Sequence, residues 1–367
     1  MKNKNLNNNE HEDQIKNTSE NTKLTRKFYW NRNLLREHQK EYNKLNKHAL
    51  ECVKDITEPK DDVAISIQHI SKIFRGKLGK PNLVLDDVSF EVKKGEFHGF
   101  IGNNGAGKTT TIRLILNYYQ KRIGKIYVNG LDSKNIHAKD KIGYIPEVSV
   151  FPQNLTIYEF LYSFARMSNL NDKQAKEKVN LLMDKYGFTS SIFKKSAQKL
   201  SSGQKKKVLL MQALINDPEI LIMDEPAANL DPSARIEFYE SIKELHHQGK
   251  TILISSHILA ELEKYIDSVT VLEGGKVKDS GKVADKLKNK IYNYKVISSD
   301  NKKLFELLKQ HKFSGLVVKD SLLLKINNAE QKSYLFTIAF LNSIEITAFA
   351  ENKMSLNQIY FNTTESE

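Results

Sequence analysis

The sequence predicts an α/β fold whose central sheet is largely parallel. From about residue 63 onward, short β-rich runs such as EFHGFIG alternate with helical stretches, an order typical of parallel sheets. A glycine-rich loop at 102–110 joins an apolar strand to a helical run. A second apolar strand, at 219–223, ends in the adjacent carboxylates Asp224 and Glu225. Both junctions indicate that functional groups lie at strand ends.

The N-terminal part is predicted to contain a polar tail and one helix. Residues 1–25 are polar and asparagine-rich, with little to bury, and are expected to be disordered. Residues 26–60 are expected to form an amphipathic helix, because apolar side chains recur at steps of three and four until Pro59. This helix either packs on its own domain or brings the aromatic residues 28–30 to a membrane or a transmembrane partner.

The rest of the chain is predicted to form two domains. Residues 61–284 are expected to form the larger one, with a helical subdomain at about 148–203, where the stretch TIYEFLYSFARMSNL has little strand character. Residues 285–367 are expected to form a small separate α/β domain, because strand-like runs such as YKVIS alternate there with helical runs such as KLFELLKQH.

Composition excludes several classes of protein. The 367 residues include 57 Lys and Arg against 44 Asp and Glu, and no apolar run approaches the ~18 residues that span a bilayer. The single cysteine, Cys52, excludes a disulfide framework and a cysteine-rich zinc site. The N-terminus lacks the apolar segment of a secretory signal, so a cytoplasmic location is expected. The basic excess is spread along the chain, so no nucleic acid partner is expected.

The glycine-rich loop has the pattern of a P-loop in its required strand–loop–helix context. Glycines let the backbone wrap around phosphates, and the amide N–H groups at the helix N-terminus face negative charge. Lys108 is expected to reach the outer phosphates, and the Thr109 hydroxyl to ligate Mg²⁺. The residues predicted to bind ATP here are Gly102, Asn103, Asn104, Gly105, Ala106, Gly107, Lys108, Thr109 and Thr110.

The two carboxylates at 224 and 225 are predicted to divide the remaining chemistry. Adjacent side chains at a strand end point in different directions, so Asp224 can hold the metal's water shell while Glu225 polarises the attacking water. An acidic strand end alone is more often a solvated turn. Its presence in one chain with a P-loop favours the catalytic interpretation.

With the loop at 200–204, the sequence resembles the nucleotide-binding subunits of ABC transporters. Their LSGGQ signature completes the ATP site of the opposite protomer. Here Ser202 stands in place of a glycine, which adds a small side chain next to an expected phosphate contact. Ser201, Gly203 and Gln204 match the family pattern, and the resemblance implies that they bind ATP.

Four further motifs follow the family pattern. Gly143–Glu147 resembles the Q-loop, with Glu147 where glutamine is usual; its carboxylate is expected to meet Mg²⁺ or the water. Asp231 lies in a stretch similar to the D-loop, and His257 ends a stretch similar to the switch-histidine motif. Phe74 stands where the family stacks an aromatic ring on adenine. Structural roles, such as a helix cap for Asp231 and core packing for Phe74, remain alternatives.

The resemblance implies a P-loop NTPase fold with an antiparallel β subdomain and a helical insert. It also implies an ATPase that uses ATP and Mg²⁺, in which two protomers enclose two ATP molecules. In it Lys108 and Thr109 restrain the triphosphate, Glu225 orients the water, and His257 contacts the γ-phosphate and links site closure to Asp231. The implied partners are a separate multi-spanning permease and a second cassette, identical or different, at the inner face of the cell membrane.

Within the family, the stretch SSHILAELEKYIDSVTVLEGGKV and the small C-terminal domain look most like exporters of drugs, lipids, polysaccharides or antimicrobial peptides. A soluble ABC-type ATPase that acts on the ribosome or DNA and an importer ATPase are the alternatives. The single cassette, the short helical insert and the single cysteine favour the transporter.

Overall fold

The computed structural model describes residues 32–76, 79–119, 122–288, 292–352, 356 and 360. The predicted tail at 1–25 lies outside these residues. The chain divides into two units, Met1–His257 with Val269–Ser280 and Ile258–Ser268 with Gly281–Glu367. The predicted boundaries of the two domains, 61–284 and 285–367, stay predictions.

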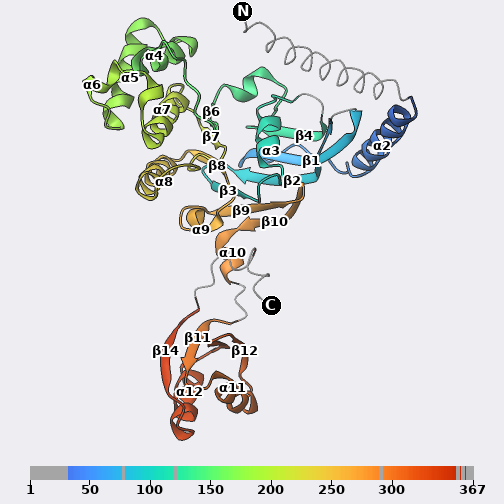
Figure 1. Ribbon diagram of the computed structural model, residues 1–367, viewed down its shortest axis with the longest axis vertical. Coiled ribbons are helices and arrows are strands. Elements are labelled where there is room, and N and C mark those ends of the chain that lie inside the picture. The colour runs from blue at the N-terminus through green and yellow to red at the C-terminus, as the bar shows by residue number, and fades with distance from the viewer. Residues whose placement is uncertain are drawn as a thin grey trace, which may run out of the picture. The chain divides into compact units, whose positions relative to one another are not determined.

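The central sheet has the strand order β10-β9-β3-β8-β7-β6 (Figure 1). Neighbouring strands β3, β8, β7 and β6 run parallel. Every residue of β3, β7 and β8 is buried, as in strands that are covered on both faces. The predicted α/β fold with a largely parallel sheet is therefore confirmed. The strands are β3 (Phe97–Ile101), β6 (Ile142–Ile145), β7 (Ile220–Met223), β8 (Thr251–Ser256), β9 (Ser268–Glu273) and β10 (Lys276–Lys282).

A second, antiparallel sheet has the order β2-β1-β4-β5 and confirms the implied β subdomain. Its strands are β1 (Val63–Arg75), β2 (Pro81–Lys93), β4 (Ile123–Val128) and β5 (Leu131–Asp132). Helix α3 (Lys108–Ile115) contacts β2 and β4. One hydrophobic core joins this sheet, α3 and the central sheet through side chains such as Ile67, Ile112 and Leu253, so the P-loop is anchored on both sheets.

The segment between β6 and β7 is helical, as expected, and its helices gather together in Figure 1. The capping boxes Thr156/Glu159 and Asn171/Gln174 start its first two helices. The insert contains α4 (Ile157–Met167), α5 (Asp172–Lys185), α6 (Ser190–Phe193) and the start of α7 (Ser202–Leu214). The first unit also contains α8 (Pro232–His247) and the 3₁₀ turns η2 (Ile136–Lys139) and η3 (Ala197–Lys199), and the second unit contains α9 (Leu259–Leu262) and α10 (Val283–Lys288).

The N-terminal helix is shorter than predicted. Helix α2 spans Arg32–Glu51, so the predicted end at residue 60 is wrong; residues 26–31 lie outside the described part. The early end of α2 is explained by contacts with another element. Gln68 of β1 donates from Nε2 to the Thr57 carbonyl (2.8 Å) and accepts from the Thr57 amide (3.0 Å), and Asp55 has a φ of 50°. Helix α2 contacts β1 and β2, which agrees with packing on its own domain.

The C-terminal unit confirms the predicted small α/β domain. Its elements are β11 (Tyr294–Ser298), α11 (Asn301–Gln310), β12 (Ser314–Val318), β13 (Ser321–Lys325), α12 (Ala329–Leu341) and β14 (Ile346–Glu351). The antiparallel sheet has the order β12-β13-β11-β14, which is the split βαβ arrangement of ferredoxin-like folds. Leu304, Leu322 and Leu335 belong to a separate hydrophobic core.

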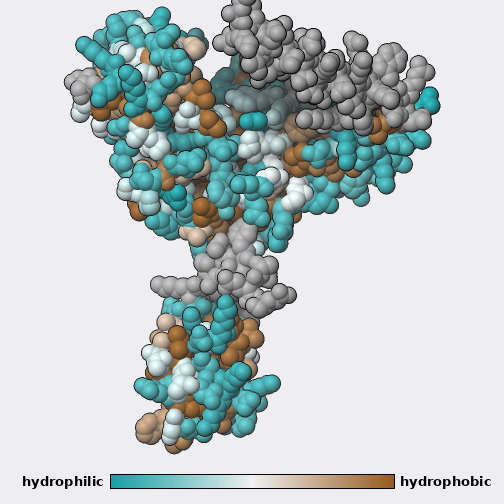
Figure 2. Space-filling view, in the orientation of Figure 1, coloured by the Kyte–Doolittle hydropathy of each residue, from teal (hydrophilic) through white to brown (hydrophobic). Residues whose placement is uncertain are grey.

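None of the helices in the described part of the chain combines the length and apolar character that crossing a bilayer requires. The face drawn in Figure 2 is largely hydrophilic, with hydrophobic residues in scattered patches.

Candidate nucleotide site

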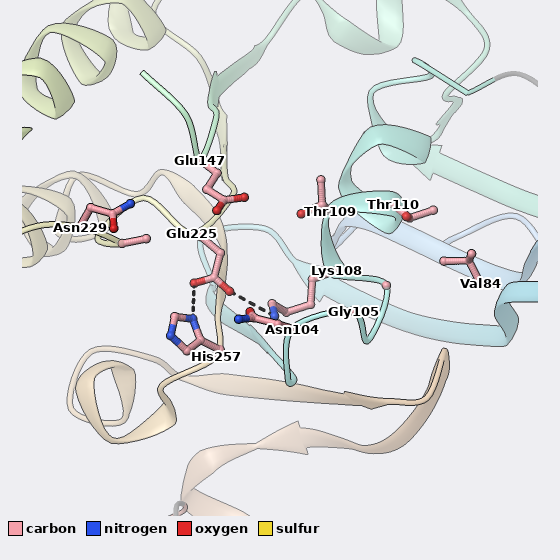
Figure 3. A pocket seen from close by; sticks show the side chains of 12 residues that line it. Val84, Asn104, Gly105, Lys108, Thr109, Thr110, Glu147, Glu225, Asn229 and His257 are labelled. Atoms are coloured by element: carbon pink, nitrogen blue, oxygen red, sulfur yellow. Dashed lines mark hydrogen bonds and ion pairs between the residues drawn. The ribbon is translucent and has the colours of Figure 1, made fainter. Parts of the chain in front are cut away.

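A cavity of about 560 Å³ lies where several strands of the central sheet end (Figure 3). The P-loop follows β3, and Glu147, Glu225 and His257 follow β6, β7 and β8. Because these strands are parallel neighbours, their carboxyl ends meet at one edge, where open α/β sheets bind ligands. The lining residues are Val84, Asn104, Gly105, Gly107, Lys108, Thr109, Thr110, Glu147, Glu225, Ala228, Asn229 and His257.

The backbone of the P-loop requires glycine at two positions. Gly107 caps the N-terminus of α3 with a φ of 111°, and a Cβ there would lie 2.5 Å from Cδ2 of Leu85. A Cβ on Gly102 would lie 2.4 Å from the Leu272 carbonyl oxygen. Helix α3 has no acidic residue in its first turn, so its N-terminal amides and dipole favour an anion.

Lys108 is held inside the loop. Its Nζ donates to the carbonyl oxygens of Gly102 and Asn103 and lies 3.1 Å from Oε1 of Glu225. Both charged side chains are at most 10% exposed. The lysine is therefore fixed at the P-loop end of the cavity, paired with the carboxylate that is predicted to polarise water.

Asp224 and Glu225 point in different directions, as the sequence predicts. The Thr109 hydroxyl donates to Oδ1 of Asp224 (3.1 Å), and the Ser255 hydroxyl donates to the same oxygen (2.8 Å). The Glu225 amide donates to Ser255 Oγ (2.9 Å), which holds the two acids in fixed orientation. Two neighbouring ligands of Mg²⁺ lie about 3 Å apart, so Thr109 and Asp224 fit that ion. Glu147 faces Thr109 across the cavity in Figure 3.

Glu225 lies between Lys108 and His257. Nδ1 of His257 lies 2.9 Å from Oε2 of Glu225, and Figure 3 shows both contacts of the carboxylate. The backbone of Glu225 has a φ of 45°, a left-handed conformation that costs energy for a residue with a side chain. Strain at this position is typical of a functional residue, because the surrounding bonds must enforce it.

Sequence reasoning missed one buried residue, Lys206 of α7. Its Nζ donates to the carbonyl oxygens of Pro146 (3.0 Å) and Glu147 (2.6 Å). Burial lowers the pKa of Lys206 to about 8, although Glu147 and Asp224 oppose this shift. The lysine thus ties the helix after the signature loop to the segment that carries Glu147. It stands in the run Lys205–Lys207, where the sequence offers no sign that one lysine is buried.

Replacing Lys206 with methionine is expected to lower the free energy of unfolding by about 1–3 kcal/mol, because two carbonyl groups lose their donor while the side-chain volume is kept. Denaturant unfolding measures this change. Lys207→Met is the matched control: Lys207 pairs with the exposed Glu237, and such pairs contribute about 0–1 kcal/mol. Equal unfolding midpoints for the two variants would contradict the role assigned to Lys206.

Phe74 does not line the cavity at the P-loop. Its ring packs edge-on against Tyr119 at 5.2 Å, and Nζ of Lys72 lies 4.9 Å from its centroid. Phe74 instead lines a separate cavity with Tyr42 of α2 and Arg75. The structure shows the packing role, and stacking on adenine stays a prediction.

The signature residues and Asp231 also lie outside the cavity lining. Ser201 and Gln204 form a capping box that starts α7. Asp231 caps α8 by accepting a hydrogen bond from the Ala234 amide (2.9 Å). The hydrogen bond from the Ser233 hydroxyl, and next the one from the Ala234 amide, lower the pKa of Asp231. It stays a prediction that these residues and Gly203 contact ATP across a dimer. Asn229, which lines the cavity with a φ of 62°, was not singled out from the sequence.

Ser202 occupies the first position of α7. Ser202 is exposed, and its φ is not positive, so this position does not need glycine for its backbone conformation. The departure from the family pattern therefore leaves the start of α7 regular.

Comparisons with known proteins agree with this geometry. Residues 85–228 match the family model described as ABC transporter. The chain is 39% identical to a putative ABC transporter ATP-binding protein of Mycoplasma pneumoniae, over 82% of this chain and 92% of that protein. It is 36% identical to Nod factor export ATP-binding protein I of Rhizobium johnstonii, over 58% of this chain and 68% of that protein.

Many solved structures are similar to the chain, and two of them serve as examples. One is an ATP-binding subunit of an ABC transporter, with 32% identity and a TM-score of 0.54, over 60% of this chain and 91% of that one. The other is a dimeric ATP-binding cassette bound to ADP and Pi, with 20% identity and a TM-score of 0.54, over 60% of this chain and 98% of that one. The second structure has the same fold as this chain.

Proposed function

This chain belongs to the ABC transporter family as an ATP-binding subunit with ABC-type ATPase activity, and we propose that it powers an exporter of drugs, lipids or antimicrobial peptides. The Nod factor export proteins among its relatives support the direction of transport. The proposed role in ATP hydrolysis rests on the position of Glu225, whose carboxylate lies in the cavity at the P-loop, between Lys108 and His257.

The residues around the cavity are proposed to act by position and charge. Lys108 and the α3 amides neutralise the phosphates, which is most of what phosphoryl transfer requires of a protein. Thr109 and Asp224, with Glu147 facing them, would hold Mg²⁺, which supplies further charge neutralisation at the phosphates. Glu225 accepts a proton from the attacking water and keeps it oriented. His257 holds the Glu225 carboxylate and would contact the γ-phosphate.

We propose that two cassettes, identical or different, close on two ATP molecules. Asn229 already lines the cavity, and it lies two residues before Asp231. The loop of the signature residues Ser201, Gly203 and Gln204 would complete the site of the opposite protomer. A separate multi-spanning permease at the inner face of the cell membrane would carry the transport path.

The partner is tested by recovering what binds the ATP-trapped protein. Tagged Glu225→Gln protein is incubated with ATP in membranes of its native cells, solubilised gently and purified. We expect a multi-spanning membrane protein to co-purify, and to be lost in the double variant that also carries Lys108→Ala. Ribosomes or DNA-bound proteins without a membrane protein would instead support a soluble ABC-type ATPase.

The direction of transport is tested with the recovered permease in vesicles that expose the cassette and ATP on the outside. An exporter is expected to concentrate fluorescent drugs or labelled lipids in the lumen. ATP-driven loss of a preloaded solute from the lumen would indicate an importer.

A further inference from the structure

Three potential metal ligands meet where helix α2 ends against strand β2. His48 and Cys52 are one helical turn apart, so they project from the same face, and the Cys52 amide donates to the His48 carbonyl (3.2 Å). Nε2 of His48 lies 3.1 Å from Oδ1 of Asp86 and 4.0 Å from Sγ of Cys52. One ligand atom of each residue lies within 4.8 Å of the others. None of the three belongs to the nucleotide site.

The donor set and its spacing fit a zinc-like ion. Sulfur, imidazole nitrogen and carboxylate oxygen are the ligands that zinc takes in proteins, at about 2.0–2.3 Å. Two ligands of a tetrahedral zinc then lie roughly 3.5 Å apart, between the two distances found here. Small side-chain rotations would bring all three atoms to one ion. Half of the His48 side chain is exposed, so an ion can reach the site from solvent.

The charge around the site is mixed. Asp86 is mostly buried, and Lys276 pairs with its other oxygen, Oδ2, at 3.0 Å, which leaves Oδ1 facing His48. Burial, and then the charges of Asp87 and Asp86, raises the pKa of the Cys52 thiol. A bound cation reverses this effect, because a coordinated thiol loses its proton. The same carboxylates attract the cation, against the repulsion of Lys276.

We propose that His48, Cys52 and Asp86 bind one divalent transition metal, best matched by zinc, and that the ion fastens α2 to β2. The same strand carries Leu85, which packs against the Gly107 position of the P-loop, and Val84, which lines the nucleotide cavity. The Asp86 amide donates to the Gly275 carbonyl, and the Gly275 amide donates to the carbonyl of Ala106 in the P-loop. The metal thus joins the N-terminal helix to the wall of the ATP site.

Cobalt substitution tests the site with a signal from one residue. A cobalt–thiolate bond gives an intense near-ultraviolet band, and the chain has one cysteine, so the band reports Cys52 alone. Full-length, nucleotide-free protein is titrated with Co²⁺. We expect the band to appear, to saturate and to disappear when Zn²⁺ is added. Zn²⁺ is also expected to slow maleimide labelling of Cys52, and a chelator to restore it.

Variants of the other two ligands show whether Co²⁺ is bound by all three residues or by Cys52 alone. His48→Ala and Asp86→Asn should each weaken Co²⁺ binding by at least roughly 10–100-fold. Replacing a residue that only supports a metal ligand already causes a loss of that size. His137→Ala is the control, since His137 is equally paired with an aspartate, Asp140, but lies elsewhere. Circular dichroism confirms folding. No thiolate band in the wild type, or a band of unchanged affinity in both ligand variants, would overturn the proposal.

Discussion

Glu225→Gln is expected to slow ATP hydrolysis by roughly 10²–10⁴-fold, the usual contribution of a general base. The glutamine side chain keeps the shape of glutamate but cannot accept a proton from water. ATP binding should persist, because the P-loop and Lys108 are unchanged. The protein is therefore expected to accumulate as an ATP-bound dimer.

Phosphate release measures the first effect, and light scattering after gel filtration with ATP measures the second. The matched control is Glu219→Gln, because Glu219 is an exposed carboxylate at the opposite end of the same strand, bonded to Asn129. That variant should hydrolyse ATP like the wild type. Wild-type turnover in Glu225→Gln would remove Glu225 from its assigned role.

Lys108→Ala is expected to weaken ATP binding by roughly 10–100-fold, since hydrogen bonds to charged groups contribute about 1.5–3 kcal/mol. The same change also affects the nucleotide-free protein. It leaves the Glu225 carboxylate, which is 10% exposed, without its cationic partner at 3.1 Å. The free energy of unfolding should therefore fall by about 1–3 kcal/mol, with the remaining contact to His257 limiting the loss.

A double-mutant cycle isolates the pair. In the Glu225→Gln background no buried carboxylate is left unpaired, so Lys108→Ala should cost less stability there than in the wild type. Fluorescent-nucleotide titration and denaturant unfolding give the two quantities. Lys93→Ala, which breaks the exposed pair with Asp62 at 2.9 Å, is the control and should change stability by about 0–1 kcal/mol. Equal losses in both backgrounds would show that the Lys108–Glu225 contact contributes nothing to stability.

Contiguous features were predictable from the sequence. The P-loop, the paired acids and the strand before each of them lie within short stretches, so their residue types and periodicity reveal local geometry directly. The helix cap at Asp231, which the sequence predicts as an alternative role, is also a local feature, and it is present. The end of α2 was not predictable, because Gln68, in a different element, holds Thr57 out of the helix.

The sequence by itself determined the fold class, the ATPase motifs and their order, because each depends on residues that are close along the chain. Only the tertiary structure decided which distant side chains meet: His257 with Glu225, Lys206 with the Glu147 segment, and His48 and Cys52 with Asp86. These contacts depend on strand order and on how helices pack against the sheets. Neighbouring positions in the sequence, such as Lys205 and Lys206, give no sign of such differences in burial.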